Sequence, residues 1–464
     1  MAMTRRDLLP AAAAAMALAP GLGSRAWGAP LPREADIVVI GAGAAGIAAA
    51  RRIQAANRKV IMVEAAAQIG GRCLTDTATF EVPFDRGARW LHNPETNPMI
   101  KLARNAGLDI FTAPVGQKIR IGQRYARPGE TEEFLAALVR ANRAIDDGSR
   151  GRADVSCASV LPKDLGDWAG TAEFVLGANG TGKDLPDISV VDKARAQDRN
   201  ATIGCRQGLG VLIAKLAEPL PLALATPVSQ VIWTGGRDVA VETSAGKIAA
   251  RAAIVTVSSN VLAAGNIKFT PELPKRHLDA AAKLNLGSYD RITLQLPGNP
   301  LGLSRDDAII EQSNSTRTAL LSANIGGSSL CTVDVAGSFG RDLSGQGEKA
   351  MVAFAVEWLG KLFGSDVAAA VKKSSATRWN AAPFVLGAMS VAPPGGQPSR
   401  KILTEPIGNV FLAGEATHET LWGTVDGAWE SGERAAEAAL KKIGALSEPV
   451  TAPVRAQKGR RRGS

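Results

Sequence analysis

Hydrophobic residues are placed most regularly between residues 36 and 64, where two short apolar runs flank an alanine-rich segment. Asp36–Ile40 and Lys59–Val63 are rich in β-branched residues, which is typical of strands buried on both faces of a parallel sheet. Ile47–Ala56 lies between them and predicts a helix. The order strand, helix, strand indicates a βαβ unit.

Farther along the chain, apolar residues at helical spacing predict helices over residues 131–146, 349–363 and 424–440. Alternating apolar residues over 292–296 and the apolar run 410–412 predict two more strands. No internal repeat is visible in the sequence.

The turn between the first strand and the first helix is glycine-rich, with Gly41, Gly43 and Gly46 in a GxGxxG pattern. The first glycine permits the tight turn, the second lets the backbone approach a pyrophosphate, and the third lets helix and strand pack closely. The helix N-terminus offers free N–H groups to phosphate. Glu64 ends the second strand 18 residues after Gly46, where it can accept hydrogen bonds from a ribose. The pattern predicts a dinucleotide site, and a glycine turn in an αβ core is the alternative.

The residues after Glu64 favour FAD over NAD. Gly70-Gly71-Arg72 follows Glu64 after a short turn. This spacing is typical of the FAD site in one large group of flavoproteins. Arg72 would hold phosphate or flavin polar atoms as a rigid fork.

Composition and length exclude several classes of protein. The chain has 464 residues, 45% hydrophobic and 21% charged, which suggests two or three domains and rules out collagen, a disulfide knot and wholesale disorder. Its four cysteines stand far apart without a CxxC pair, and there are only three histidines. We therefore expect no metal site.

The formal net charge of +10 lies mostly at the two ends of the chain. Residues 1–28 carry +2 and residues 451–464 carry +5, which leaves +3 for the rest. The basic residues of the C-terminal segment have no interleaved aromatic residues, so we expect no nucleic-acid partner. Residues 445–464 are predicted to be a disordered basic tail.

The N-terminus resembles an export signal. Arg5-Arg6 within Thr4–Leu9 is a twin-arginine pattern, and an alanine-rich apolar run follows it. Small residues at Ala26 and Gly28 suit cleavage before Ala29. The apolar run is shorter than the roughly 20 residues that a spanning helix needs, so we expect no stable membrane anchor. The prediction is a twin-arginine signal peptide over residues 1–28 and a periplasmic or secreted protein, and a disordered alanine-rich leader is the alternative.

Several separate motifs in the same order resemble the flavin-containing amine oxidase family, which includes monoamine and polyamine oxidases and the related histone demethylases. The resemblance runs from about Ala35 to Ala439. The motifs that carry it, besides those above, are Asp85–His92, Gly208–Ala217, Thr226–Val228, Ile254–Val257, Ile267–Pro271, Trp379 with Pro383 and Gly387, Val410–Ala416, and Gly423–Ala428 with Arg434.

The resemblance implies an α/β fold in which a Rossmann-like FAD-binding domain of the glutathione-reductase type is interleaved with an α+β substrate domain that has a mixed sheet. The FAD-binding domain would be built from residues 30–110, 200–285 and 400–444. The substrate-binding domain would use residues 111–199 and 286–399.

The resemblance also implies an enzyme, an FAD-dependent amine oxidase or amine dehydrogenase that oxidises the C–N bond of an amine. The C–H next to nitrogen would pass as hydride to flavin N5, and the imine would then hydrolyse. Glu415 would hydrogen-bond the ribityl hydroxyls, and the helix that starts at Thr424–Val425 would face the flavin N1/C2=O edge. The residues expected to bind FAD are Gly41, Gly43, Ala45, Gly46, Glu64, Ala65, Gly71, Arg72, Gly87, Ala88, Arg89, Trp90, Val228, Gly414, Glu415, Thr424 and Val425.

The sequence departs from the family pattern at the flavin. Arg291 stands where the family has a lysine that is hydrogen-bonded through water to flavin N5, and arginine does not exchange a proton at neutral pH. This departure makes an electron carrier a credible acceptor beside O2, and a structural ion pair of Arg291 with a carboxylate is the alternative. Ala388 stands where monoamine oxidases attach flavin through cysteine, so we expect non-covalent FAD.

The aromatic cage of the monoamine oxidases is also missing, because Thr424 and a residue near Ala392 occupy its two positions. Trp422 and Trp379 are candidates for an aromatic wall, although buried packing is the commoner role of tryptophan. Asp426 replaces a family histidine and is expected to cap the helix rather than to attract an amine.

Histidines are the remaining candidates for the site. His92 is expected to face the substrate, with a structural role as the alternative. His418 is a weaker candidate for lining the cofactor, and His277 is expected at the surface. The catalytic candidates are therefore Arg291, His92, Trp422 and Trp379.

Two other functions remain open. A related flavoenzyme could oxidise a C–C or ring bond, as a desaturase or a protoporphyrinogen-type oxidase does. A non-catalytic flavin-binding protein would also explain the missing lysine and cage. The identity of the amine, the acceptor and the oligomeric state cannot be derived from the sequence.

Overall fold

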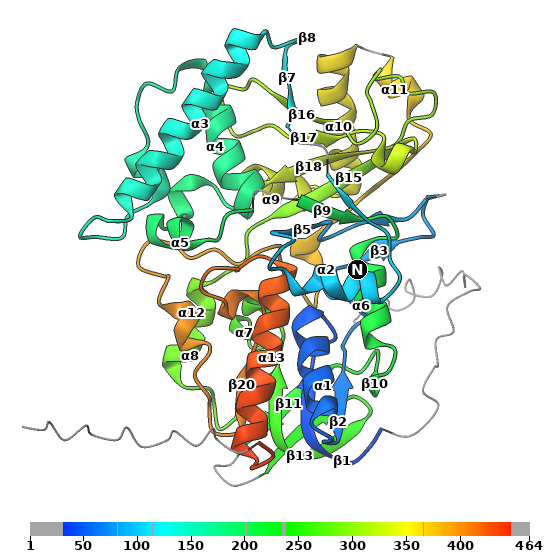
Figure 1. The fold of residues 1–464 in the computed structure, drawn as a ribbon, viewed down its shortest axis with the longest axis vertical. Helices are drawn as coiled ribbons and strands as arrows, with labels where there is room; N and C mark the ends of the chain where they lie inside the picture. Colours follow the sequence, from blue (N-terminus) through cyan, green and yellow to red (C-terminus); the bar gives the residue numbers. More distant parts are fainter. Residues whose placement is uncertain are drawn as a thin grey trace, which may run out of the picture. The chain divides into compact units, whose positions relative to one another are not determined.

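The computed structural model describes residues 31–80, 82–113, 116–199, 202–233, 238–364 and 366–446. The predicted signal peptide lies outside these residues, as does most of the predicted basic tail. Two large sheets dominate the described part of the chain (Figure 1).

The first sheet has eight strands in the order β10-β2-β1-β13-β12-β11-β14, with β20 paired to the end of β13. Its strands are β1 (Glu34–Ile40), β2 (Val60–Val63), β10 (Leu222–Ala223), β11 (Val228–Ile232), β12 (Val239–Thr243), β13 (Gly246–Val255), β14 (Lys268–Thr270) and β20 (Val410–Leu412). The run β10, β2, β1, β13 and β20 is parallel, whereas β12 lies antiparallel between β13 and β11. A parallel layer with an antiparallel extension confirms the expected Rossmann-like half.

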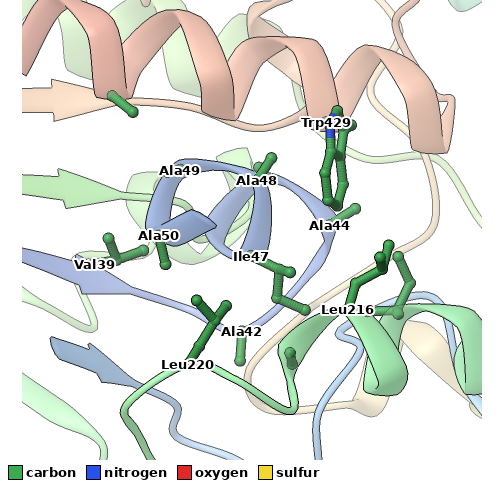
Figure 2. Packing of buried hydrophobic residues seen from close by; sticks show 14 of the residues in the cluster. Val39, Ala42, Ala44, Ile47, Ala48, Ala49, Ala50, Leu216, Leu220 and Trp429 are labelled. Carbon is green, nitrogen blue, oxygen red and sulfur yellow. The ribbon is translucent and has the colours of Figure 1, made fainter. Parts of the chain in front are cut away.

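Two helices cover one face of this parallel layer. Helix α1 (Ala44–Ala55) packs against α13 (Val425–Lys442), and the two run side by side in Figure 1. Alanines fill much of the contact, and Figure 2 shows Trp429 of α13 lying against Ala44 of α1. The approach is close because a Cβ on Gly432 of α13 would lie 2.0 Å from the carbonyl oxygen of Ala45. The small side chains therefore fix the position of the first turn of α1.

The second sheet has seven strands in the order β19-β15-β18-β17-β16-β7-β8. They are β7 (Lys118–Ile121), β8 (Arg124–Tyr125), β15 (Tyr289–Gln295), β16 (Ala308–Glu311), β17 (Leu320–Ser322), β18 (Leu330–Ala336) and β19 (Lys373–Ala376). The pair β16–β7 is parallel and the other pairs are antiparallel. This is the mixed sheet that the family resemblance implies.

The other helices and two small sheets complete the described fold. The helices are α2 (Pro98–Asn105), α3 (Pro128–Gly148), α4 (Ala169–Phe174), α5 (Val190–Arg195), α6 (Leu209–Ala217), α7 (Ser259–Ala263), α8 (Lys275–Lys283), α9 (Gly337–Gly345), α10 (Glu348–Phe363), α11 (Val367–Ala370) and α12 (Ser399–Ile402). The small sheets are β3 (Thr75–Asp76) with β4 (Phe84–Asp85), and β5 (Trp90–His92) with β9 (Thr202–Cys205) and β6 (Ile110–Thr112).

Each element predicted from the hydrophobic pattern is present within a few residues of its expected limits. The four cysteines are free and buried, and the described residues hold no cluster of three or more potential metal ligands. Within the same residues, no helix combines the length and the hydropathy that crossing a membrane requires.

Candidate active site

One cavity of about 1190 Å³ is lined by residues from both large sheets and from the loops between them. All the predicted cofactor-binding and catalytic residues line it except Gly46 and Trp422. Segments far apart in the sequence, such as the glycine-rich turn, β18 and the start of α13, therefore meet at one place.

The glycine-rich turn forms one end of this cavity. Gly41 has a φ of +108°, which residues with a side chain rarely adopt. A Cβ on Gly46 would lie 2.0 Å from the Gly41 carbonyl oxygen, so Gly46 allows close packing without facing the cavity. The N-cap of α1, Gly43, makes no side-chain capping hydrogen bond, so the N–H groups of the first turn are available to an anion.

Glu64 is fixed beside this turn. One carboxylate oxygen accepts a hydrogen bond from the Ala42 N–H at 2.7 Å, and the other accepts from the Ala66 N–H at 2.8 Å. Each oxygen keeps a further lone pair, so the carboxylate can still accept hydrogen bonds from a ribose. Val228, at the start of β11, also lines this end of the cavity.

Arg72 and Glu415 form an ion pair at the middle of the cavity wall, 2.8 Å apart. Glu415 also accepts hydrogen bonds from the Ser390 hydroxyl at 2.6 Å and from the Gly423 N–H at 2.7 Å. Burial acts to raise the pKa of Glu415, but the charges of Arg72 and Arg400 together with the hydrogen bonds from Ser390 and Arg72 outweigh it, so the pKa is lowered. The oxygens of Glu415 are thus hydrogen-bonded by protein groups that fix Arg72 and the turn before α13, and the expected role of Glu415 toward ribityl hydroxyls stays a prediction.

The start of α13 faces the same cavity through Thr424, Val425 and Ala428. The Thr424 hydroxyl accepts a hydrogen bond from the Gly427 N–H at 3.0 Å and is the N-cap. The expectation that Asp426 caps the helix is therefore wrong. Asp426 lies in the first turn, and burial raises the pKa of its carboxyl group.

Arg291 is buried on β15 and pairs with Asp334 of β18 through two hydrogen bonds of 2.9 and 3.0 Å. A third nitrogen donates to the carbonyl oxygens of Asp85 and Gly87, the latter at 3.1 Å. Burial acts to lower the pKa of Arg291, but pairing with Asp334 outweighs it and raises the pKa. The structural ion pair held open as an alternative is present, and the same arginine lines the cavity.

His92 ends β5 and lines the cavity. Burial, and then the charge of Arg199, lower the pKa of its imidazole to about 4, so the ring is neutral at neutral pH. Its Nδ1 is buried without a hydrogen-bond partner among the described residues. The ring therefore can orient a ligand but is not poised to take a proton near neutral pH.

Three other expectations for individual side chains are corrected. Trp422 is 1% exposed and does not line the cavity, and the side chain of Arg400 stacks on its ring. His418 also lies off the cavity and pairs with Glu430 at 3.1 Å. His277 is buried rather than at the surface. The second cage position was expected near Ala392; Ala392 itself is fully buried, and Met389, three residues before it, lines the cavity beside Gly423.

Trp379 does line the cavity, and a Cβ on Gly87 would lie 3.2 Å from its ring. Sequence reasoning missed several further lining residues, because no local motif marks them. They are Asn179, Arg199, Tyr289, Asp334, Phe384 and Met389.

Comparison with known proteins identifies the class. Residues 44–440 match the family described as flavin containing amine oxidoreductase, and the chain belongs to that family. The chain is therefore a flavin-dependent enzyme of amine oxidation. Its cofactor is FAD, held without a covalent bond, and Ala388 in the cavity wall offers no thiol for attachment.

Individual relatives are moderately similar. "Probable polyamine oxidase 4" of Arabidopsis thaliana is 27% identical, covering 87% of this chain and 86% of the relative. "Lysine-specific histone demethylase 2" of Homo sapiens is 26% identical over 86% of this chain, which spans only 53% of that protein. Among solved structures, cyclohexylamine oxidase from Brevibacterium oxydans IH-35A has a TM-score of 0.74 at 20% identity, covering 88% of this chain and 99% of that one, and shows the same fold.

Proposed function

We propose that this protein oxidises the C–N bond of a small amine and passes the electrons to an electron carrier rather than mainly to O2. The observation that supports this is the pairing of Arg291 with Asp334, at the position where, by the family resemblance, a lysine is expected. When bound, FAD would supply the oxidising chemistry by taking a hydride from the carbon next to nitrogen, and water would hydrolyse the iminium to a carbonyl compound and ammonia or an amine.

The protein's own residues position the reactants. The free N–H groups of the first turn of α1 and the Arg72 guanidinium suit the two phosphates. The N-terminus of α13 presents its positive end to the cavity and favours negative charge there. Trp379 and Met389 give the wall apolar surface that excludes water from the reacting carbon. No side chain in this set is required as a strong base if the amine enters neutral.

The acceptor follows from proton chemistry. A lysine ammonium can release and regain a proton, whereas the Arg291 guanidinium keeps its proton at all physiological pH values. The pairing with Asp334 strengthens this difference, because it raises the pKa of Arg291 further. A residue that cannot exchange protons is a poor aid to the proton-coupled reaction with O2.

We also propose that the protein works in the periplasm. The twin-arginine pattern at Arg5-Arg6 supports export of the folded, FAD-loaded chain. A periplasmic electron carrier, such as a c-type cytochrome, would then be within reach as the acceptor.

Anaerobic reduction of the bound flavin tests the proposal. A panel of amines and amino acids is mixed with the oxidised holoenzyme, and bleaching of the flavin absorbance is followed. Reoxidation is then timed in air and with a c-type cytochrome. We expect bleaching by at least one amine and faster reoxidation by the cytochrome. Bleaching only by phytoene-type or porphyrinogen substrates would favour the desaturase alternative, and no bleaching by any compound would favour a non-catalytic flavin protein.

A further inference from the structure

The charged side chains around the cavity are unequal in number. Five arginines line it, and three carboxylates do so. The arginines are Arg72, Arg86, Arg89, Arg199 and Arg291, and the carboxylates are Glu64, Glu415 and Asp334.

Every one of these carboxylates already has protein partners. Glu415 pairs with Arg72 and Asp334 pairs with Arg291, while Glu64 accepts two backbone N–H groups at the nucleotide end. Tyr289 adds a further hydrogen bond to Asp334 at 2.9 Å. The lining therefore offers no unpaired carboxylate to the second ammonium group of a diamine.

Arg199, in contrast to these carboxylates, has no oppositely charged partner at ion-pair distance among the described residues. Its Nη2 donates to the Trp422 carbonyl oxygen at 2.7 Å, and its guanidinium carbon lies 5.3 Å from the Trp422 ring centroid. No carboxylate of the described residues is within ion-pair distance of it, and Asp426 and Glu415 act on it only from farther away. Burial lowers the pKa of this guanidinium, which is the cost of holding a charge away from water.

Arg199 lies beside the turn before α13, where Gly423 and Met389 also line the cavity. A Cβ on Gly423, next to the N-cap of α13, would lie 3.7 Å from Arg199 Nη2 and 3.4 Å from the Met389 Cβ. His92 is close enough for its pKa to respond to Arg199, and its buried Nδ1 has no partner among the described residues. Arg199 and His92 therefore both line the cavity and are near enough to interact electrostatically.

From this arrangement we infer that Arg199 binds an anionic group of the substrate, so that the enzyme takes an amine that carries a carboxylate and discriminates against di- and polyamines. This inference rests on the proposed function, since it names the substrate class of the same site. A carboxylate would pair with the guanidinium in bidentate fashion. A second ammonium group would instead meet the charge of Arg199, which has no carboxylate within ion-pair distance among the described residues, whereas Arg89 is paired with Asp306 at 3.6 Å.

Ligand binding to the oxidised holoenzyme tests the inference without turnover. Benzoate and benzamide have nearly the same shape and differ in charge, and each is titrated while the flavin absorbance and equilibrium dialysis are recorded. We expect benzoate to bind at least about tenfold more tightly than benzamide. Equal affinities, or no binding of benzoate at millimolar concentration, would overturn the inference.

Variants locate the binding group. Arg199→Gln is expected to weaken benzoate binding by roughly 10- to 100-fold and to leave benzamide unchanged, whereas Arg199→Lys keeps the charge and gives an intermediate loss. Arg195→Gln is the matched control, because Arg195 is exposed on α5 and pairs with Glu419 at 3.6 Å. If Arg199→Gln shifts the flavin potential but leaves benzoate binding unchanged, Arg199 serves the flavin and the inference fails. If Arg199→Gln loses flavin, the benzoate affinity of Arg199→Lys relative to the wild type decides whether Arg199 binds the anion.

Substrate reduction separates the two proposals. Amines and their carboxylated counterparts, such as butylamine and 4-aminobutyrate, are compared in anaerobic flavin reduction, with putrescine as the dication. Reduction only by amines without a carboxylate would contradict the anion site and leave amine oxidation intact. Absence of all reduction, together with charge-selective benzoate binding, would contradict amine oxidation and leave the anion site intact.

Discussion

At the scale of single residues, Arg291 carries the clearest chemical consequence. We predict that Arg291→Lys speeds reoxidation of the reduced enzyme by O2 by roughly 100-fold, because the ammonium can exchange a proton. Stopped-flow mixing of the reduced enzyme with air-saturated buffer measures this rate. Arg378→Lys is the control, because Arg378 donates to the Ser344 carbonyl oxygen and does not line the cavity. An unchanged rate with O2 would show that proton exchange at residue 291 does not control reoxidation by O2.

His92 gives a prediction on pH. Its pKa of about 4 leaves about one imidazole in a hundred protonated at pH 6, so its titration falls below the physiological range. The rate of flavin reduction should therefore show the same pH dependence between about pH 6 and pH 9 in the wild type and in His92→Asn. A wild-type inflection near pH 6.5 that disappears in the variant would show that the ring titrates and acts as a base.

Some residues of the candidate site could be predicted from the sequence, and others could not. The turn from Gly41 to Gly46, with Glu64, could be located because one short segment contains all of its chemistry. The partner of Arg291 could not, because Asp334 lies 43 residues away and meets it only through the antiparallel register of β15 and β18. Arg199 stands outside any motif, and only the fold brings it to Gly423.

At the scale of elements, the contact of α1 with α13 positions the phosphate-facing turn. We predict that Gly432→Ala destabilises the fold by about 1–3 kcal/mol and weakens FAD binding, because the new Cβ would meet the Ala45 carbonyl oxygen at 2.0 Å. Chemical unfolding and the FAD content of the purified protein measure the two effects.

A matched control lies in α10. Gly360 has open space where its Cβ would be, so Gly360→Ala should stabilise the protein by about 0.5–1 kcal/mol and leave FAD content unchanged. If both glycine substitutions had the same effect, helix propensity rather than close packing would explain the result.

The elements themselves were largely predictable because their patterns are local. Helix α3 was expected over residues 131–146 and spans Pro128–Gly148, the extra first turn being set by Pro128 and by the Glu130 carboxylate, which accepts from the Arg127 N–H at 2.7 Å. The π-helical turn Val175–Asn179, which ends at the cavity, had no sequence signal, because its geometry is imposed by packing. The division into two interleaved domains stays a prediction.

At the scale of the whole molecule, the balance of charge and the proposed export are linked. The full chain carries +10 and would carry +8 without residues 1–28, and +5 of that remainder lies in residues 451–464. An exported enzyme that takes an anionic amine would meet its substrate outside the cytoplasm, and it would deliver electrons there as well. The acceptor proposal therefore depends on where the mature chain works, whereas the anion site is tested on the isolated holoenzyme.

Export gives the last prediction. In a cell with twin-arginine transport, the wild-type chain should appear in the periplasm with FAD bound and with Ala29 as its first residue. Arg5→Lys with Arg6→Lys should stay in the cytoplasm at full length and still hold FAD, since the described FAD-site residues lie beyond the exchanged pair. Fractionation, N-terminal sequencing and the flavin spectrum of each fraction measure these outcomes. Equal export of the double variant, or a mature chain that retains residues 1–28, would show that the twin-arginine pair is not part of a cleaved export signal.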